Sequence, residues 1–76
     1  MKINIVIADD WEGLYLNNRL IEEGHKIKRL ELVGVMKEFN TFDVEEQWLN
    51  NAGIEAVERI GSLPSKYDDI ARYITQ

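Results

Sequence analysis

The segment Lys2–Ala8, which reads KINIVIA, constrains the fold of this chain more than any other stretch. Its residues Ile3, Ile5 and Ile7 fall at every second position, so they share one side of an extended backbone. The segment is rich in β-branched side chains, which fit a pleated and partly buried surface. We therefore expect a β-strand here, and it is the most secure element of the chain.

Two structures compete for residues 11–24. In the first, strands over 11–16 and 19–23 form a β-hairpin that turns at Asn17-Asn18, because asparagine tolerates a positive φ better than most residues. In the second, the segment is one helix that ends at a Gly24 cap. Gly13 and the two asparagines are weak helix formers, which favours the hairpin.

A helix is predicted after the hairpin. Apolar residues recur every three or four positions over Ile27–Glu38, which is the pattern of an amphipathic helix. Gly34 and the valines beside it leave a strand over Glu31–Val35 as the alternative. Ile54–Ile60 fits either a helical turn or a strand.

Two further helices are predicted from capping signals. Asp43 is expected to cap a helix over Val44–Asn51, where early acidic residues suit the helix dipole. Ser65 and Asp68 resemble a capping pair for a last helix over Lys66–Ile74.

These elements predict a single α+β domain over residues 1–76, with an N-terminal β-hairpin or small antiparallel sheet packed against two or three short helices. No linker, internal repeat or low-complexity tract divides the sequence. A domain of 76 residues buries a small share of its surface, so it must pack economically or associate. A homodimer is therefore one expectation.

Composition excludes several classes of function. The chain has no cysteine, which rules out disulfides and thiolate metal sites and fits a reducing cytoplasm, and its single histidine rules out a multi-histidine metal centre. The net charge of −5 disfavours nonspecific nucleic-acid binding, which needs basic residues to neutralise phosphates. A nucleic-acid partner would have to use a short basic island: Lys26, Lys28, Arg29 and Lys37.

The sequence pattern predicts a soluble cytoplasmic protein. No apolar run approaches the roughly 18 residues that a membrane-spanning helix needs. The N-terminus also lacks the basic start and small-residue cleavage site of a signal peptide.

Asp9 and Asp10 directly follow the first expected strand. The stretch KINIVIADD resembles the opening of a response-regulator receiver domain, in which paired acids at the end of the first strand help to hold a magnesium ion. The resemblance implies a metal site, but such a domain also needs a phospho-accepting aspartate after a third strand and a later lysine. This chain has no strand that ends in an isolated aspartate of that kind. The competing interpretation places both acids on a solvated edge or bend.

Other residue types that carry chemistry are isolated from one another. His25 lies near Glu22 and Glu23 in the sequence, but one histidine with flexible acids suits a capping or surface role better than a metal site. Ser62 and Ser65 lack the partners of a catalytic triad, and the five glycines are too scattered for a phosphate-binding loop. We therefore expect no enzyme and no catalytic, metal-binding or cofactor-binding residue.

Aromatic residues are many for so small a core. Tryptophan and tyrosine anchor protein interfaces because they bury a large area at little cost in entropy. In the hairpin, Trp11 and Tyr15 are expected on the same side as Ile7. The candidate interface combines aromatic and acidic residues: Trp11, Tyr15, Trp48, Asp9 and Asp10. The alternative is that the aromatic side chains all fill the core.

Residues 11–25, which read WEGLYLNNRLIEEGH, resemble a motif of small uncharacterised proteins from phages and Gram-positive bacteria. The motif has the form W-x-G-L-Y-x-N-G-K-L-x-x-x-G-H and is followed by a helix and an L-P pair like Leu63-Pro64. Asn18 stands where the motif has its turn glycine. The resemblance implies a phage or mobile-element accessory protein, a class often made of small binders that modify or block host machinery. It carries over no functional residue.

The sequence thus predicts a small acidic, non-enzymatic protein-binding module of phage or mobile-element type that inhibits or modulates a host protein. The alternatives are a receiver-like metal-binding fragment that uses Asp9 and Asp10, and a structural accessory protein. The identity of the partner does not follow from the sequence.

Overall fold

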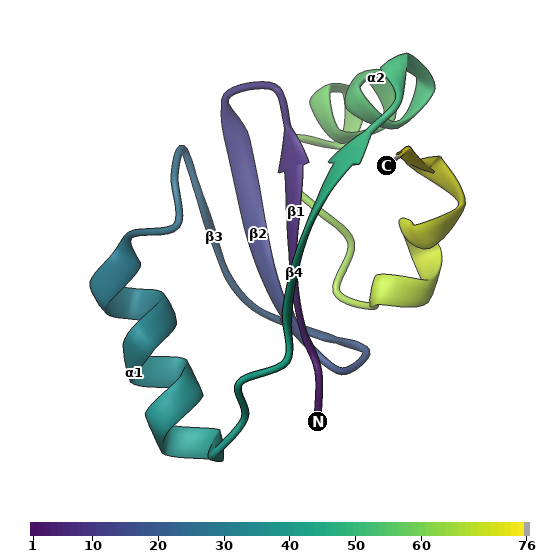
Figure 1. Ribbon diagram of the computed structural model, residues 1–76. Coiled ribbons are helices and arrows are strands. Elements are labelled where there is room, and N and C mark those ends of the chain that lie inside the picture. Colours follow the sequence, from purple (N-terminus) through teal and green to yellow (C-terminus); the bar gives the residue numbers. More distant parts are fainter. Residues whose placement is uncertain (76) are drawn as a thin grey trace.

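A five-stranded mixed β-sheet forms the centre of the computed structural model, which describes residues 1–75 (Figure 1). The strands follow the order β3-β2-β1-β4-β5 across the sheet. Antiparallel pairing joins β1 to β2 and β2 to β3, whereas β4 is parallel to β1 and β5 is antiparallel to β4. The bounds are Ile3–Ala8 (β1), Trp11–Leu16 (β2), Arg19–Gly24 (β3), Val44–Leu49 (β4) and Ile74–Thr75 (β5).

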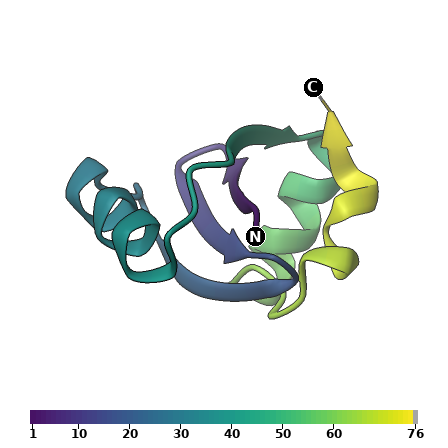
Figure 2. The same cartoon turned by 60° about the horizontal axis from the view of Figure 1, so that its bottom comes forward.

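Helical segments cover both sides of the sheet (Figure 2). On one side lies α1 (Arg29–Phe39), and on the other lie α2 (Asn51–Ile60) and two 3-10 turns, η1 (Tyr67–Asp69) and η2 (Ala71–Tyr73). This arrangement confirms the predicted α+β class, with an N-terminal sheet packed against helices. Within residues 1–75, neither helix has the length and apolar content needed to span a membrane.

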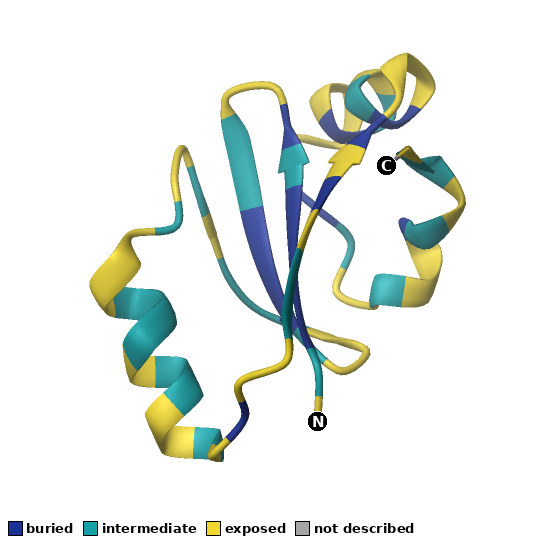
Figure 3. Cartoon of the chain, in the orientation of Figure 1, coloured by how far each residue is buried: buried dark blue, intermediate teal, exposed yellow. Residues whose placement is uncertain are grey.

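The larger core lies between the sheet and α2. Figure 3 marks the buried residues of the chain in dark blue. The buried members of this core come from three strands, from α2 and from the chain that follows it: Val6, Ala8, Tyr15, Leu49, Val57, Leu63 and Ile70. The hydroxyl of the fully buried Tyr15 donates a hydrogen bond to the carbonyl oxygen of Pro64 over 2.6 Å. That bond satisfies a polar group that would be costly to bury alone.

The core on the α1 side is thinner. Its buried residues come from the strands: Ile3, Ile5 and Leu14. The helix α1 adds partly buried residues: Leu32, Val35 and Met36. No residue of α1 is buried, and Leu30 on its outer side is 84% exposed. Because the apolar residues are spread around α1, only a narrow stripe of them holds the helix to the sheet.

The predicted hairpin over residues 11–24 is confirmed. β2 and β3 pair across the turn at Asn17-Asn18, where Asn17 has a φ of 55°, a value that asparagine tolerates. Asp9 has a φ of 60° in the preceding turn between β1 and β2. The helix alternative for 11–24 is wrong, and so is the strand alternative for Glu31–Val35, which lies within α1.

The helix predicted over Val44–Asn51 is wrong. The segment forms β4, because its backbone pairs in parallel with Ile3–Ile7 of β1. Asp43 caps no helix, and its carbonyl oxygen instead accepts a hydrogen bond from the N–H of Ile3 over 2.8 Å. The helix begins later, where the side-chain oxygen of Asn50 accepts the N–H of Gly53 over 2.8 Å and so caps α2.

The helix predicted over Lys66–Ile74 is also wrong, because this segment forms η1, η2 and the start of β5. Its first backbone donors bond to the β2–β3 turn. The N–H of Tyr67 donates to the carbonyl oxygen of Asn18 over 3.0 Å, and the N–H of Asp68 donates to Oδ1 of Asn18 over 2.8 Å. Asp68 therefore forms no capping pair with Ser65.

Substitutions at two glycines, one in each helix, test how closely α1 and α2 pack against their neighbours. A Cβ at Gly53 in α2 would lie 2.6 Å from the Cβ of Tyr73, whereas a Cβ at Gly34 in α1 would meet nothing within 4 Å. We expect Gly53→Ala to lower the free energy of unfolding by about 1–3 kcal/mol through overpacking. Gly34→Ala should raise it by about 0.5–1 kcal/mol, because alanine loses less entropy in a helix. Urea unfolding measures both, and equal shifts would contradict the close packing of α2.

Candidate functional site

The five predicted interface residues lie on different parts of the molecule. Trp11 and Tyr15 belong to the α2 side of the sheet. Trp48 pairs with Ile7 and belongs to the α1 side. Asp9 and Asp10 form the exposed turn between β1 and β2. The structure therefore does not bring the five together into one surface.

Tyr15 is the predicted interface residue that the fold removes from the surface. Its ring is fully buried and packs edge-on against Tyr67, with the ring centroids 5.5 Å apart. Burial raises the pKa of its hydroxyl, which stays protonated as the donor to Pro64. Ile7 does not share its side, because Ile7 pairs with Glu12 and faces α1. Tyr15 is therefore not available to contact a partner, and it does not lie on the same side of the sheet as Ile7. Both expectations are wrong.

The acids of the first turn are exposed and stay apart from other metal-ligand side chains. Asp9 and Asp10 lie in a bend, where the second interpretation of this pair places them. Within residues 1–75, no three histidine, cysteine, aspartate or glutamate side chains gather closely enough to hold a metal ion. Within the described residues, Asp9 and Asp10 therefore have no third side chain beside them that could complete a metal site.

Trp11 makes its polar contact within the fold. Its Nε1–H donates to Oε1 of Glu23 over 2.9 Å, and its ring meets the ring of His25 edge-on with centroids 5.1 Å apart. The same oxygen of Glu23 accepts the N–H of Leu63 over 3.0 Å. Glu23 therefore ties β3 to the chain that follows α2, and His25 packs beside the indole.

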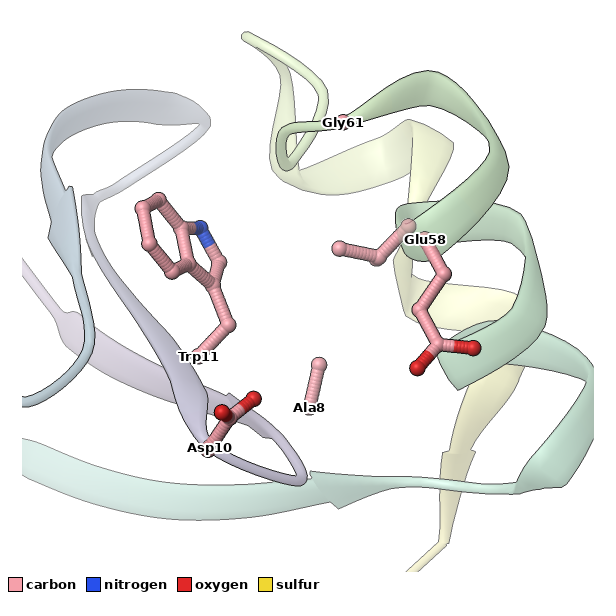
Figure 4. A pocket seen from close by; sticks show the side chains of 6 residues that line it. Ala8, Asp10, Trp11, Glu58 and Gly61 are labelled. Atoms are coloured by element: carbon pink, nitrogen blue, oxygen red, sulfur yellow. The ribbon is translucent and has the colours of Figure 1, made fainter.

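A small hollow lies between the β1–β2 turn and α2 (Figure 4). Asp10 reaches it from the turn and Glu58 from α2, while Trp11 forms one wall. Its volume is about 170 Å³. Sites for drug-sized ligands usually occupy roughly 300–1,000 Å³, so this hollow is too small for a ligand of that size.

Two exposed aromatic residues lie on β4 or directly before it. Trp48 on the strand is 51% exposed, and Phe42, just before the strand, is 71% exposed. Acidic residues lie between them along the chain. We call this region the β4 surface and define it by its members: Phe42, Asp43, Glu45, Glu46 and Trp48. Within the strand, Glu46 and Trp48 lie on the α1 side, whereas Glu45 lies on the side of Leu49.

The β4 surface carries net negative charge. Lys2 forms an ion pair with Glu45, with 2.6 Å between Nζ and Oε1. This hydrogen bond and the charge of Lys2 lower the pKa of the Glu45 carboxyl. An exposed pair of this kind adds little stability, but it neutralises one acid of the surface. Asp43 and Glu46 form no ion pair with another described residue, so their charges remain.

A groove of about 450 Å³ lies between the sheet and α1, next to the β4 surface. Its lining combines apolar and charged side chains: Ile5, Glu12, Lys26, Ile27, Arg29, Leu32 and Glu46. Glu46 belongs both to the groove and to the β4 surface. The groove exists because α1 packs thinly against this side of the sheet.

One acid of β3 and one acid of α1 are neighbours. Oε2 of Glu22 on β3 is buried without a hydrogen-bond partner, and Glu31 on α1 is its neighbour. Burial, and then the carboxylate of Glu31, raise the pKa of Glu22. A protonated Glu22 can donate a hydrogen bond to Glu31, whereas an ionised Glu22 repels it. We therefore expect α1 to be held less firmly when Glu22 is ionised.

No protein-family model, curated protein or solved structure matches this chain. The candidate site therefore rests on the geometry of the chain itself. Of the residues of this site, only Trp48 was among the predicted interface residues, and the geometry adds the other four: Phe42, Asp43, Glu45 and Glu46. The available signal was the alternation of Val44, Glu46 and Trp48 on one side of a strand, but it was hidden because residues four apart also share one side of a helix.

The acidic pair predicts a pH-dependent stability. Because the folded state raises the pKa of Glu22, its stabilising effect is complete below the ordinary pKa of a glutamate and is lost as the pH rises through the raised value. Glu22→Gln, which stays neutral, should therefore raise the melting temperature at pH 7. The difference from the unmodified protein should shrink toward pH 4.

Thermal unfolding followed by circular dichroism from pH 4 to 8 measures this difference. Glu38→Gln, at an exposed acid of the same helix, is the matched control and should change the melting temperature less at every pH. A Glu22→Gln variant that is less stable than the unmodified protein at pH 7 would contradict the interpretation.

Proposed function

We propose that this chain is a small acidic, non-enzymatic protein-binding module and that the β4 surface is its interface. The observation that carries the proposal is the 51% exposure of Trp48 on the same side of β4 as the acid Glu46. An indole is a common anchor of protein interfaces, because its contact with a partner removes a large apolar area from water. Phe42 supplies a second exposed aromatic ring before the strand.

We further propose that the module is of phage or mobile-element type, acts in the cytoplasm, and inhibits or modulates a host protein. The likeness of residues 11–25 to small phage and Gram-positive proteins supports this role. Within that stretch, Trp11 and Tyr15 make contacts inside the fold. The motif residues thus stabilise the fold, and the β4 surface, which lies outside the motif, determines which partner binds.

The charge of the β4 surface bears on the class of partner. Asp43 and Glu46 would repel the phosphates of a nucleic acid. Lys26 and Arg29, from the basic island, line the groove beside α1, and the acids Glu12 and Glu46 line the same groove. A protein with basic residues in its binding region therefore fits this surface better than DNA or RNA.

The proposal predicts that a partner depends on Trp48. Immobilised protein should retain a bacterial host protein from lysate, and Trp48→Ala should weaken that binding at least tenfold, which corresponds to about 1.4 kcal/mol, because the anchor ring is lost. Ile60→Ala is the matched control, since Ile60 is an exposed apolar residue of α2, 70% accessible, away from β4. Affinities are compared by biolayer interferometry with the purified partner.

Equal loss of binding in Trp48→Ala and Ile60→Ala would contradict an interface at the β4 surface. Sedimentation of the unmodified protein tests the expected homodimer separately. A dimer that dissociates in Trp48→Ala would identify a second copy as the partner, whereas a monomer would leave a different protein as the partner.

A further inference from the structure

The outer edge of β4 is open over much of its length. On its inner edge β4 pairs with β1 from Val44 to Trp48. On its outer edge β5 reaches only Trp48 and Leu49. Within residues 1–75, no strand therefore pairs with the outer edge over residues 44–47.

The register of the sheet identifies the backbone groups on this open edge. In a parallel ladder, alternate residues of a strand bond to a given neighbour. The N–H of Ile3 donates to the carbonyl oxygen of Asp43, so the odd-numbered residues of this stretch bond to β1. The even-numbered residues Val44 and Glu46 consequently direct their N–H and C=O groups outward. These two residues offer two donors and two acceptors to an added strand.

The opposite edge of the sheet, formed by β3, is bonded to another segment at its first two residues. The N–H of Leu20 on β3 donates to the carbonyl oxygen of Ser65 over 2.9 Å, and Arg19 pairs with Lys66. Exposed sheet edges tend to attract other chains, and proteins usually cover them or place charges on them. Acidic residues give the β4 edge some protection, but Phe42 and Trp48 add exposed apolar area to the same surface. That combination favours a specific partner over simple protection.

We propose that the open edge of β4 binds an extended segment of a partner protein that carries lysine or arginine. The segment adds a strand beside Val44 and Glu46, and its basic side chains neutralise Asp43 and Glu46. Strand addition of this kind gains affinity from backbone hydrogen bonds and specificity from the side chains on either face. This inference rests on the proposed binding function and adds the chemistry and conformation of the partner.

A second copy of this chain fits the edge poorly. Two β4 strands that pair antiparallel, with Val44 of each copy bonded to Glu46 of the other, bring the two Glu46 side chains to diagonal positions on the same side of the new pair. Long side chains reach each other across such a diagonal, so the two carboxylates, which have no ion-pair partner among the described residues, repel each other. A partner strand with lysine or arginine near Glu46 instead gains an attractive contact.

A synthetic peptide tests the proposal directly. The probe is an eight-residue peptide that alternates lysine and valine, and its control replaces each lysine with glutamate. In amide NMR spectra of isotope-labelled protein, the lysine peptide should shift Val44 and Glu46 most and slow the hydrogen exchange of both amides. Its binding should weaken as salt rises, because charge attraction contributes.

Three variants separate the backbone from the charge. Glu46→Gln removes the charge alone and should weaken the lysine peptide severalfold. Glu46→Pro also removes the outward N–H while sparing the bonds to β1, since proline is tolerated at a sheet edge, and should weaken the peptide at least tenfold further. Glu55→Gln, at an exposed acid of α2, should leave the affinity unchanged. If Glu46→Pro fails to fold, the shift map and Glu46→Gln decide.

The outcomes distinguish this inference from the proposed function. Peptide shifts elsewhere, equal binding of the glutamate peptide, or a dimer with protected Val44 and Glu46 amides would each overturn the inference. If neither peptide binds while retention of a host protein still depends on Trp48, the inference fails and the proposed function stands. If the lysine peptide binds at the edge but no retention depends on Trp48, the proposed function fails and the edge remains a peptide site.

Discussion

Strand β1 is paired along both of its edges, and every layer of the molecule is built on it. β2 joins it antiparallel on one edge and β4 joins it parallel on the other. Its alternating side chains reach both cores, with Ile3 and Ile5 toward α1, and Val6 and Ala8 toward α2. A strand that is buried on both faces and bonded on both edges leaves little backbone or apolar surface in water. The helices and the C-terminal segment take their positions from this strand.

The parallel pairing of β4 with β1 explains why one side of the molecule remains open. Parallel neighbours need a long crossover connection, and here α1 lies within that connection between β3 and β4. α1 covers its side of the sheet with partly buried residues, and the acids Glu22 of β3 and Glu31 of α1 are neighbours there. Trp48 and the groove next to it are therefore left accessible by the way the crossover packs.

Elements held by nearby residues could be predicted from the sequence, and elements held by distant ones could not. The first strand, the hairpin at Asn17-Asn18 and α1 depend on local alternation, turn chemistry and helical spacing. β4 depends on pairing with β1, about forty residues earlier in the chain. Val44 and Trp48 lie on a common side in a strand and also in a helix, so their spacing does not distinguish the two structures. The local signal favoured an Asp43 cap, whereas the cap that forms is Asn50.

The candidate site shows the same division between local and distant information. Exposed tryptophan at position 48 could be proposed from composition, but the burial of Tyr15 depends on Leu63, Ile70 and the carbonyl oxygen of Pro64. No sequence pattern near Tyr15 predicts that these residues contact it. The open edge of β4 likewise follows from the pairing of the segment with β1, because a helix has no such edge.

The two hydrogen bonds from η1 to Asn18 join a turn made early in synthesis to a segment made late. While the ribosome is still adding residues 63–70, β1, β2 and β3 already exist as chain but lack the side chains that close their α2 face. Contacts of such long sequence separation form slowly, because a large loop must close first. Until residues 63–70 have emerged, the nascent chain therefore presents Val6, Ala8 and Tyr15 to water.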